Sequence, residues 1–188
     1  MKTPPHTNVR PRKKGERLYR VVLDMDGTLA NFHAEKNAIL NFAVLNGFFL
    51  RLKPNKLTFV INEMIEKKQI NPNRIYVVSA SPHEQADKDK LEWLKDNCPQ
   101  VPKKNVLFTR IGENKADRFK DTFKIKDFRK YILVDDFTLN LKEWVNAGGE
   151  VMKYLNNYNN TTKNYLKLGI KPLDLSNTNS LLNYKLSY

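Results

Sequence analysis

The feature that most constrains the fold of this chain is an alternation of short apolar runs with longer amphipathic stretches. A short apolar run between polar residues is typical of a buried strand, and apolar residues about 3.6 positions apart are typical of a helix. Strands separated by helices pair in parallel, so the pattern predicts an α/β fold with a doubly wound, mainly parallel sheet between helix layers. The predicted strands are residues 18–23, 75–78, 105–108, 131–134 and 151–155, and the predicted helices are 33–46, 56–69, 83–97 and 138–147, with a last one near Leu181 capped by Ser176.

Polar side chains that can support chemistry follow four of the predicted strands. In a doubly wound sheet, ligands bind outside the carboxyl ends of the strands. Four such positions along one edge indicate a functional site much more specifically than a single pair of aspartates does. In chain order they are Asp24 with Asp26, Ser79 with Ser81, Thr109 with Arg110, and Asp135 with Asp136.

Carboxylates from two strand ends suit phosphoryl transfer. Mg²⁺ prefers oxygen ligands and can bind a substrate phosphate at the same time. One aspartate can attack phosphorus and form an aspartyl-phosphate, while a second protonates the leaving oxygen and later activates water. Small hydroxyls and backbone N–H groups can hold the phosphoryl oxygens, and a lysine can balance the remaining charge. The pattern therefore predicts a magnesium-dependent phosphatase.

Two segments resemble the first motifs of the haloacid dehalogenase (HAD) superfamily of phosphatases. LDMDGTL resembles the first motif, which implies that Asp24 is the nucleophile and Asp26 the acid–base. YVVSAS resembles the second motif, which implies that Ser79 and the adjoining Ala80 bind phosphate. Ser81 stays open as an alternative to Ser79, because the SASP segment can be aligned either way. The resemblance implies a Rossmann-like three-layer sandwich with a minimal helical cap.

The third and fourth motifs of the same superfamily have counterparts in GENKAD and ILVDDF. They imply that Lys115 is the phosphate-binding lysine and that Asp135, with Asp136 beside it, belongs to the metal site. Lys120 and Lys104 stay open as alternatives, because a long interval separates Lys115 from the fourth motif. The metal site implied by the resemblance consists of Asp24, Asp26 through its backbone carbonyl, Asp135 and Asp136.

Little of the sequence is left for a cap over the site. The helix at 56–69 is needed to cover the sheet, so only about residues 33–55 can form a cap, and the cleft is expected to be open. DMDGTLANF is similar to the opening of the 5′(3′)-deoxyribonucleotidases, which implies that Phe32 packs on a nucleobase. VLFTRIGENK is similar to a Thr-Arg stretch of the same enzymes, which implies substrate binding by Arg110. The favoured substrate is a nucleotide or a similar small phosphate.

Charge and composition limit the partners. The net charge is +13, and six basic residues face one acidic residue within residues 1–17, which we expect to be a disordered arm before a domain at 18–188. This arm could contact nucleic acid, although a solvated tail is the simpler interpretation. No apolar run approaches the roughly 20 residues of a membrane span, and the basic start is not a signal peptide. A single cysteine, Cys98, rules out an internal disulfide, so we expect a cytoplasmic protein without a membrane partner.

Three other interpretations compete with a small-molecule phosphatase. Polynucleotide 3′-phosphatases of the same superfamily also have a reduced cap and a long basic interval before the fourth motif, and the high positive charge suits an enzyme that acts on nucleic-acid ends. A non-enzymatic, basic nucleic-acid-binding protein on a HAD fold is the alternative of another class, and the intact first and fourth motifs argue against it. A calcium loop starting at Asp24 fails, because Leu29 occupies the position that needs glycine.

Overall fold

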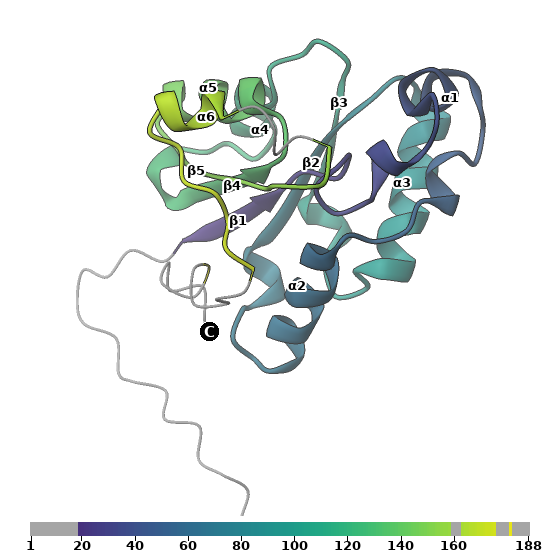
Figure 1. Cartoon of the computed structure of the whole chain (residues 1–188). Coiled ribbons are helices and arrows are strands. Elements are labelled where there is room, and N and C mark those ends of the chain that lie inside the picture. Colours follow the sequence, from purple (N-terminus) through teal and green to yellow (C-terminus); the bar gives the residue numbers. More distant parts are fainter. Residues whose placement is uncertain (1–18, 159–162, 176–180, 182–188) are drawn as a thin grey trace, which may run out of the picture.

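The computed structural model describes residues 19–158, 163–175 and 181. Five parallel strands form one sheet in the order β3-β2-β1-β4-β5, which confirms the predicted α/β fold (Figure 1). The strand order reverses beside β1, because β2 pairs with one side of β1 and β4 with the other. The strands are β1 (Arg20–Leu23), β2 (Ile75–Ser81), β3 (Val106–Arg110), β4 (Tyr131–Asp135) and β5 (Glu150–Lys153).

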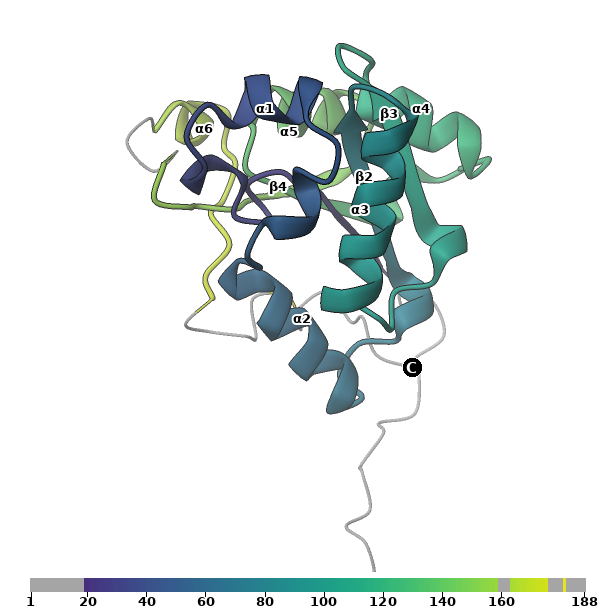
Figure 2. The same cartoon turned by 90° about the vertical axis from the view of Figure 1, so that its right-hand side faces the viewer.

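Helices cover both faces of the sheet, as Figure 2 shows from the side of α3. Helices α2 (Lys56–Glu66) and α3 (Glu84–Asn97) lie on one face, and α4 (Lys115–Thr122) and α5 (Thr138–Asn146) lie on the other. Apolar residues at helical spacing bury one side of α2, and Trp93 of α3 joins the same core cluster. On the opposite face, Phe119 and Trp144 pack in a second cluster. The three predicted layers are therefore present.

The helix predicted at 33–46 is wrong in one respect, because the chain breaks it into two pieces. A 3-10 helix, η1 (Phe32–Ala34), is followed by α1 (Ala38–Val44). Asn37 between them has a φ of 55°, which is the left-handed conformation that asparagine tolerates better than most residues. We refer to these two pieces, together with η2 (Phe49–Arg51) and the residues that connect them, as the cap.

Several strand ends also differ from the prediction, since β4 includes Asp135 and β5 ends at Lys153. Strand β2 continues through Ser79 to Ser81, and β3 continues through Thr109 to Arg110, so these polar residues end their strands instead of following them. Parallel pairing extends over the additional residues, since Ser79 is in register with Phe108 and Ser81 with Arg110. A strand that neighbouring elements bury can include polar residues. The hydrophobicity of the local sequence does not show that such residues belong to the strand.

Within the described residues, α4 and the short α6 (Asn164–Lys167) are α-helices that were not predicted. Helix α4 has a clear start, because the Asn114 side chain accepts hydrogen bonds from the backbone N–H groups of Ala116 and Asp117. The predicted basic arm at 1–17 and the predicted cap Ser176 lie outside the described residues. Among the residues described, no helix combines the length and apolarity needed to cross a membrane.

Candidate active site

The site lies where the strand order reverses, at the carboxyl ends of β1 and β4. The backbone N–H of Asp24 donates to the carbonyl of Val134 at 3.0 Å, so the pairing of the two strands sets Asp24 beside the end of β4. The carboxylates of Asp24, Asp135 and Asp136 offer oxygens that all lie within 4.8 Å of one another, and all three residues are buried. The sequence predicted this convergence, and the geometry fits three ligands for one cation.

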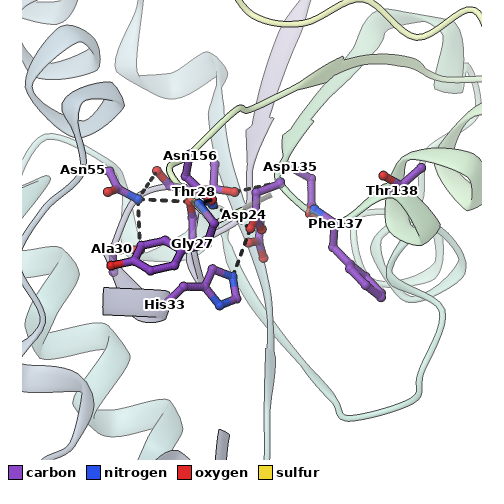
Figure 3. Close-up of polar contacts among 12 residues, drawn as sticks. Asp24, Gly27, Thr28, Ala30, His33, Asn55, Asp135, Phe137, Thr138 and Asn156 are labelled. Atoms are coloured by element: carbon purple, nitrogen blue, oxygen red, sulfur yellow. Dashed lines mark hydrogen bonds and ion pairs between the residues drawn. The ribbon is translucent and has the colours of Figure 1, made fainter. Parts of the chain in front are cut away.

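A tight turn after Asp24 brings the backbone close to this carboxylate group. Gly27 has a φ of 80°, and a Cβ atom there would lie 2.4 Å from Oδ2 of Asp136. The Asn55 side chain donates to the carbonyls of Gly27, Thr28 and Ala30, which fixes the turn from the start of α2 (Figure 3). The Thr28 hydroxyl accepts from the backbone N–H of Asp136 at 3.0 Å. Glycine is therefore required where the two strand ends meet.

Lys115 is the lysine that reaches the carboxylates. Its Nζ donates to Oδ1 of Asp24 at 2.5 Å and to Oδ2 of Asp135 at 3.2 Å, and its side chain is only 6% exposed. It is the first residue of α4, and the Asn114 cap fixes its direction. The two alternatives raised by the sequence, Lys120 and Lys104, are exposed to solvent.

Burial and charge act in opposite directions on these groups. Burial raises the pKa of the Asp24 carboxyl well above its usual value, and the Lys115 ammonium opposes that rise. Burial also raises the pKa of Asp135, again against Lys115. For Lys115 itself, burial would lower the pKa, but the carboxylates of Asp135 and Asp24 together raise it above the usual value. The ammonium is thus held in its charged form between two carboxylates.

Asp26 is turned away from this group, toward a second buried lysine. Nζ of Lys90 lies 2.8 Å from the Asp26 carboxylate, and it also donates to Oγ of Ser79 at 2.8 Å and to the carbonyl of Ala80 at 2.6 Å. No local sequence pattern signals Lys90, which lies among other charged residues of α3. The Asp26 carboxylate is not part of the three-carboxylate group, and metal binding through its backbone carbonyl stays a prediction.

The two serines of β2 have different surroundings. Ser79 is completely buried and is hydrogen-bonded to Lys90, close to Asp26. Ser81 donates instead to the carbonyl of His83 at the start of α3, at 3.3 Å. This difference favours Ser79 as the hydroxyl that belongs to the site.

The contacts described for the two remaining predicted substrate residues are with other groups than Asp24, Asp135 and Asp136. Phe32 is 4% exposed and packs edge-on against Phe42 and Phe48 inside the cap. Arg110 is exposed, and its guanidinium pairs with the carboxylate of Asp87 at 2.6 Å. Their roles in substrate binding stay predictions.

Three side chains around Asp136 were not predicted. Nε2 of His33 lies 3.1 Å from Oδ2 of Asp136, and the hydrogen bond raises the pKa of His33. Asn156, beyond β5, donates to the same oxygen at 2.9 Å. Lys153 on β5 is buried and donates to the backbone carbonyl of Asp136 and to the Thr138 hydroxyl. No sequence pattern signalled these contacts, because they join segments far apart in the chain.

The donor set suits a hard divalent cation. The three carboxylates are oxygen donors, which Mg²⁺ prefers, and they come from two fixed strand ends instead of a flexible loop. Asp135 is oriented by the backbone N–H of Phe137 at 2.7 Å and by the Asn140 side chain at 2.9 Å. The close approach of three buried carboxylates is itself unfavourable, and a cation would reduce that repulsion.

Comparison with known proteins identifies the fold. No family model matches the chain, and no curated protein matches its sequence. A HAD-family hydrolase from Deinococcus radiodurans R1, whose structure contains phosphate and sodium, superposes with a TM-score of 0.61 at 9% identity, over 91% of this chain and 98% of that one.

Two other solved structures agree with this result. D,D-heptose 1,7-bisphosphate phosphatase from Burkholderia thailandensis superposes with a TM-score of 0.53 at 14% identity, over 90% of this chain and 99% of that one. A HAD-superfamily hydrolase from Ehrlichia chaffeensis gives 0.52 at 10% identity, over 92% and 98%. The chain thus has the α/β fold of HAD-superfamily hydrolases.

Proposed function

We propose that this protein is a Mg²⁺-dependent phosphatase that hydrolyses a phosphate monoester through an aspartyl-phosphate. The observation that carries the proposal is the buried contact of Asp24 with Lys115, within a group of three carboxylates at the reversal point of the sheet. The fold shared with HAD-superfamily hydrolases supports the same reaction class.

Each residue has its own role in the proposed reaction. An oxygen of Asp24 attacks phosphorus, the bond from phosphorus to the leaving oxygen breaks, and Asp26 gives its proton to that oxygen. Asp26 then takes a proton from water, the water oxygen attacks phosphorus, and Asp24 is released together with inorganic phosphate. Lys115 holds Asp24 in place and stabilises negative charge on the phosphoryl oxygens. Mg²⁺ held by Asp24, Asp135 and Asp136 would neutralise charge on the transferred group.

We propose a nucleotide as the substrate, because the cap carries a hollow whose lining includes His33, a residue that contacts Asp136. The hollow has a volume of about 560 Å³, within the range of small-molecule sites. His33 lines it and also contacts Asp136, so a leaving group bound there would lie next to the phosphoryl site. The full lining is His33, Glu35, Asn37, Ala38, Ile39, Leu40 and Ala43.

The character of this lining favours a nucleoside over a strand of nucleic acid. An apolar lining with a few polar groups suits a base and a sugar. Among the described residues that line the hollow there is an acid, Glu35, and no lysine or arginine to meet further phosphates. A polynucleotide 3′-phosphatase is the second candidate, supported by the net charge of +13.

A substrate panel tests the proposal. Purified protein is assayed with Mg²⁺, and separately with a chelator, on 4-nitrophenyl phosphate, on 3′- and 5′-mononucleotides and on oligonucleotides ending in a 3′-phosphate. We expect metal-dependent phosphate release, with kcat/KM highest for a mononucleotide. Higher kcat/KM on the oligonucleotide would select the second candidate, and no release from any substrate would contradict the phosphatase itself.

Two cap variants test the hollow. Leu40 lines it and is 62% exposed, so Leu40→Asp leaves the packed core untouched. Leu45, also in the cap and 44% exposed, lies outside the lining and provides the matched control, Leu45→Asp. We expect Leu40→Asp alone to raise KM for the nucleotide, with little change for 4-nitrophenyl phosphate. Equal effects of the two variants would refute the placement of the base.

A further inference from the structure

Lys90 is a fully buried lysine beside Asp26 that the motifs do not include. It lies on α3, has 0% exposure, and its ammonium contacts three groups: the Asp26 carboxylate, the Ser79 hydroxyl and the Ala80 carbonyl. A lysine ammonium has three N–H donors, so these contacts use all of them. No donor is left for a substrate, and solvent cannot reach the group. Lys90 is therefore not placed to bind phosphate itself.

The other side of the ammonium faces the cap. Nζ of Lys90 lies 4.6 Å from the ring centre of Phe42 on α1 and 4.8 Å from that of Phe49 on η2. Aromatic faces stabilise a cation at this distance, most of all where water is excluded. Neighbouring residues of α3 also hold the cap. The Asp89 carboxylate accepts from the backbone N–H of Gly47 at 2.7 Å, and the Trp93 indole donates to the carbonyl of Leu52 at 2.7 Å.

We propose that Lys90 is a positioning residue that fixes Asp26 and the Ser79 hydroxyl in their reactive orientations and links both to the seating of the cap. This inference rests on the proposed phosphatase function and assigns to α3 a role that the four motifs do not describe.

The hydrogen-bond geometry explains how one ammonium would serve both groups. An N–H that donates to Oγ of Ser79 occupies a lone pair of that oxygen, so the serine O–H points elsewhere and can donate to a phosphoryl oxygen. The same ammonium keeps the Asp26 carboxylate at a fixed distance from Ser79, which sets the path of proton transfer to the leaving group. The orientation of Ser79 and the position of Asp26 both depend on the Phe42 and Phe49 rings staying in contact with the Lys90 ammonium.

The test compares Lys90→Met with Lys88→Met. Methionine keeps the length and apolar stem of the buried side chain, and Lys88 is an exposed lysine of the same helix. With Lys90→Met, we expect kcat on a mononucleotide to fall by about a hundredfold or more, in line with the loss of positioned general acid catalysis. On 4-nitrophenyl phosphate, whose leaving group needs little acid assistance, the loss should be about tenfold smaller. Lys88→Met should match the parent on both substrates.

A double-mutant cycle with Asp26→Asn separates positioning from simple structural support. Because Lys90 also orients Ser79, adding Lys90→Met to Asp26→Asn should still lower the mononucleotide kcat, but by a factor at least about ten times smaller than in the parent. Equal losses on both substrates, or full additivity in the cycle, would overturn the proposal. If Lys90→Met does not fold, Lys90→Gln, which is also neutral but can still donate hydrogen bonds, is tested in the same cycle.

A binding-independent readout keeps this inference distinct from the proposed function. Thermal unfolding of the parent, Lys90→Met, Asp26→Asn and the double variant measures the pairing of Lys90 with Asp26 without any substrate. We expect the unfolding midpoint of the double variant to fall by less than the sum of the two single-variant decreases, because removing both charges leaves neither unpaired. Strictly additive midpoints would overturn the pairing. A parent protein that hydrolyses no phosphate monoester would instead contradict the proposed function, whatever the unfolding cycle gives.

Discussion

Replacing Lys115 with methionine removes the one ammonium that contacts both Asp24 and Asp135. Its Nζ lies 2.5 Å and 3.2 Å from the two carboxylates, whose side chains are 3% and 0% exposed. Leaving buried charges without their partner costs about 3–5 kcal/mol. For a chain of this size, each kcal/mol lowers the unfolding midpoint by roughly 2–4 °C, so we expect a fall of about 6–20 °C at neutral pH.

The loss should depend on pH in a defined direction. Burial raises the pKa values of Asp24 and Asp135 in the folded protein, and removing the ammonium takes away the opposing influence. Carboxyls with raised pKa values bind more protons when folded than when unfolded, so stability falls as pH rises through their titration range. In the presence of a chelator, the gap between Lys115→Met and the parent should therefore be larger at pH 8 than at pH 5.

The assay is thermal unfolding by circular dichroism across that pH range, with Lys120→Met as the matched control. Lys120 lies on the same helix and is exposed, so its loss should shift the midpoint by no more than about 1–2 °C, as for ordinary surface changes. If Lys115→Met unfolds within that margin of the parent at every pH, the buried contact does not exist as the structure places it. The same two variants also show which lysine is needed for turnover, because only Lys115→Met should lose activity.

Three further outcomes are expected. Asp24→Asn should stay folded and lose several decades of turnover, as expected for a lost nucleophile; retention of more than about a tenth of the rate would exclude the assignment. Gly27→Ala should lower the free energy of unfolding by at least about 2 kcal/mol more than Gly47→Ala does, because both glycines have positive φ but only Gly27 would place a Cβ against Asp136 and His33. Equal losses of unfolding free energy in denaturant titrations would show that the turn can relax. Burial raises the pKa of the Cys98 thiol to about 12, so its reaction with iodoacetamide at pH 8 should be about a thousandfold slower in the native protein than in denaturant, and fast native labelling would show that the end of α3 opens.

The sequence predicted the sheet well, because the strands are short apolar runs and four of the five are followed by polar residues at the predicted ends. It also placed Asp24 and Asp135 in one group, since parallel strands bring their carboxyl ends to a common edge. Lys115 followed from a motif resemblance, and its contact with Asp24 depends on a helix that begins at that residue.

The surroundings of the carboxylates could not be predicted in the same way. Lys90 lies in a helix with many charged residues, and nothing in its local pattern separates it from the exposed Lys88. Its burial is decided by Phe42 and Phe49, which are far away in the chain and belong to the cap. The break at Asn37 was missed for a related reason, because an asparagine in a left-handed conformation is a choice of tertiary structure that a helical pattern does not reveal.

Two carboxylates only one residue apart can serve different steps because each has an ammonium of its own. Asp24 directly follows β1 and contacts Lys115 of α4, which covers one face of the sheet. Asp26 lies in the turn and contacts Lys90 of α3, which covers the other face (Figure 2). Had both carboxylates met the same lysine, a change at one would disturb the other directly. The separate contacts mean that Lys115→Met should affect attack on phosphorus for every substrate, whereas Lys90→Met should matter most where the leaving oxygen needs a proton. A pair of leaving-group series, one for each variant, would reveal whether the two faces of the sheet divide the reaction in this way, and identical dependence on the leaving group in both variants would show that they do not.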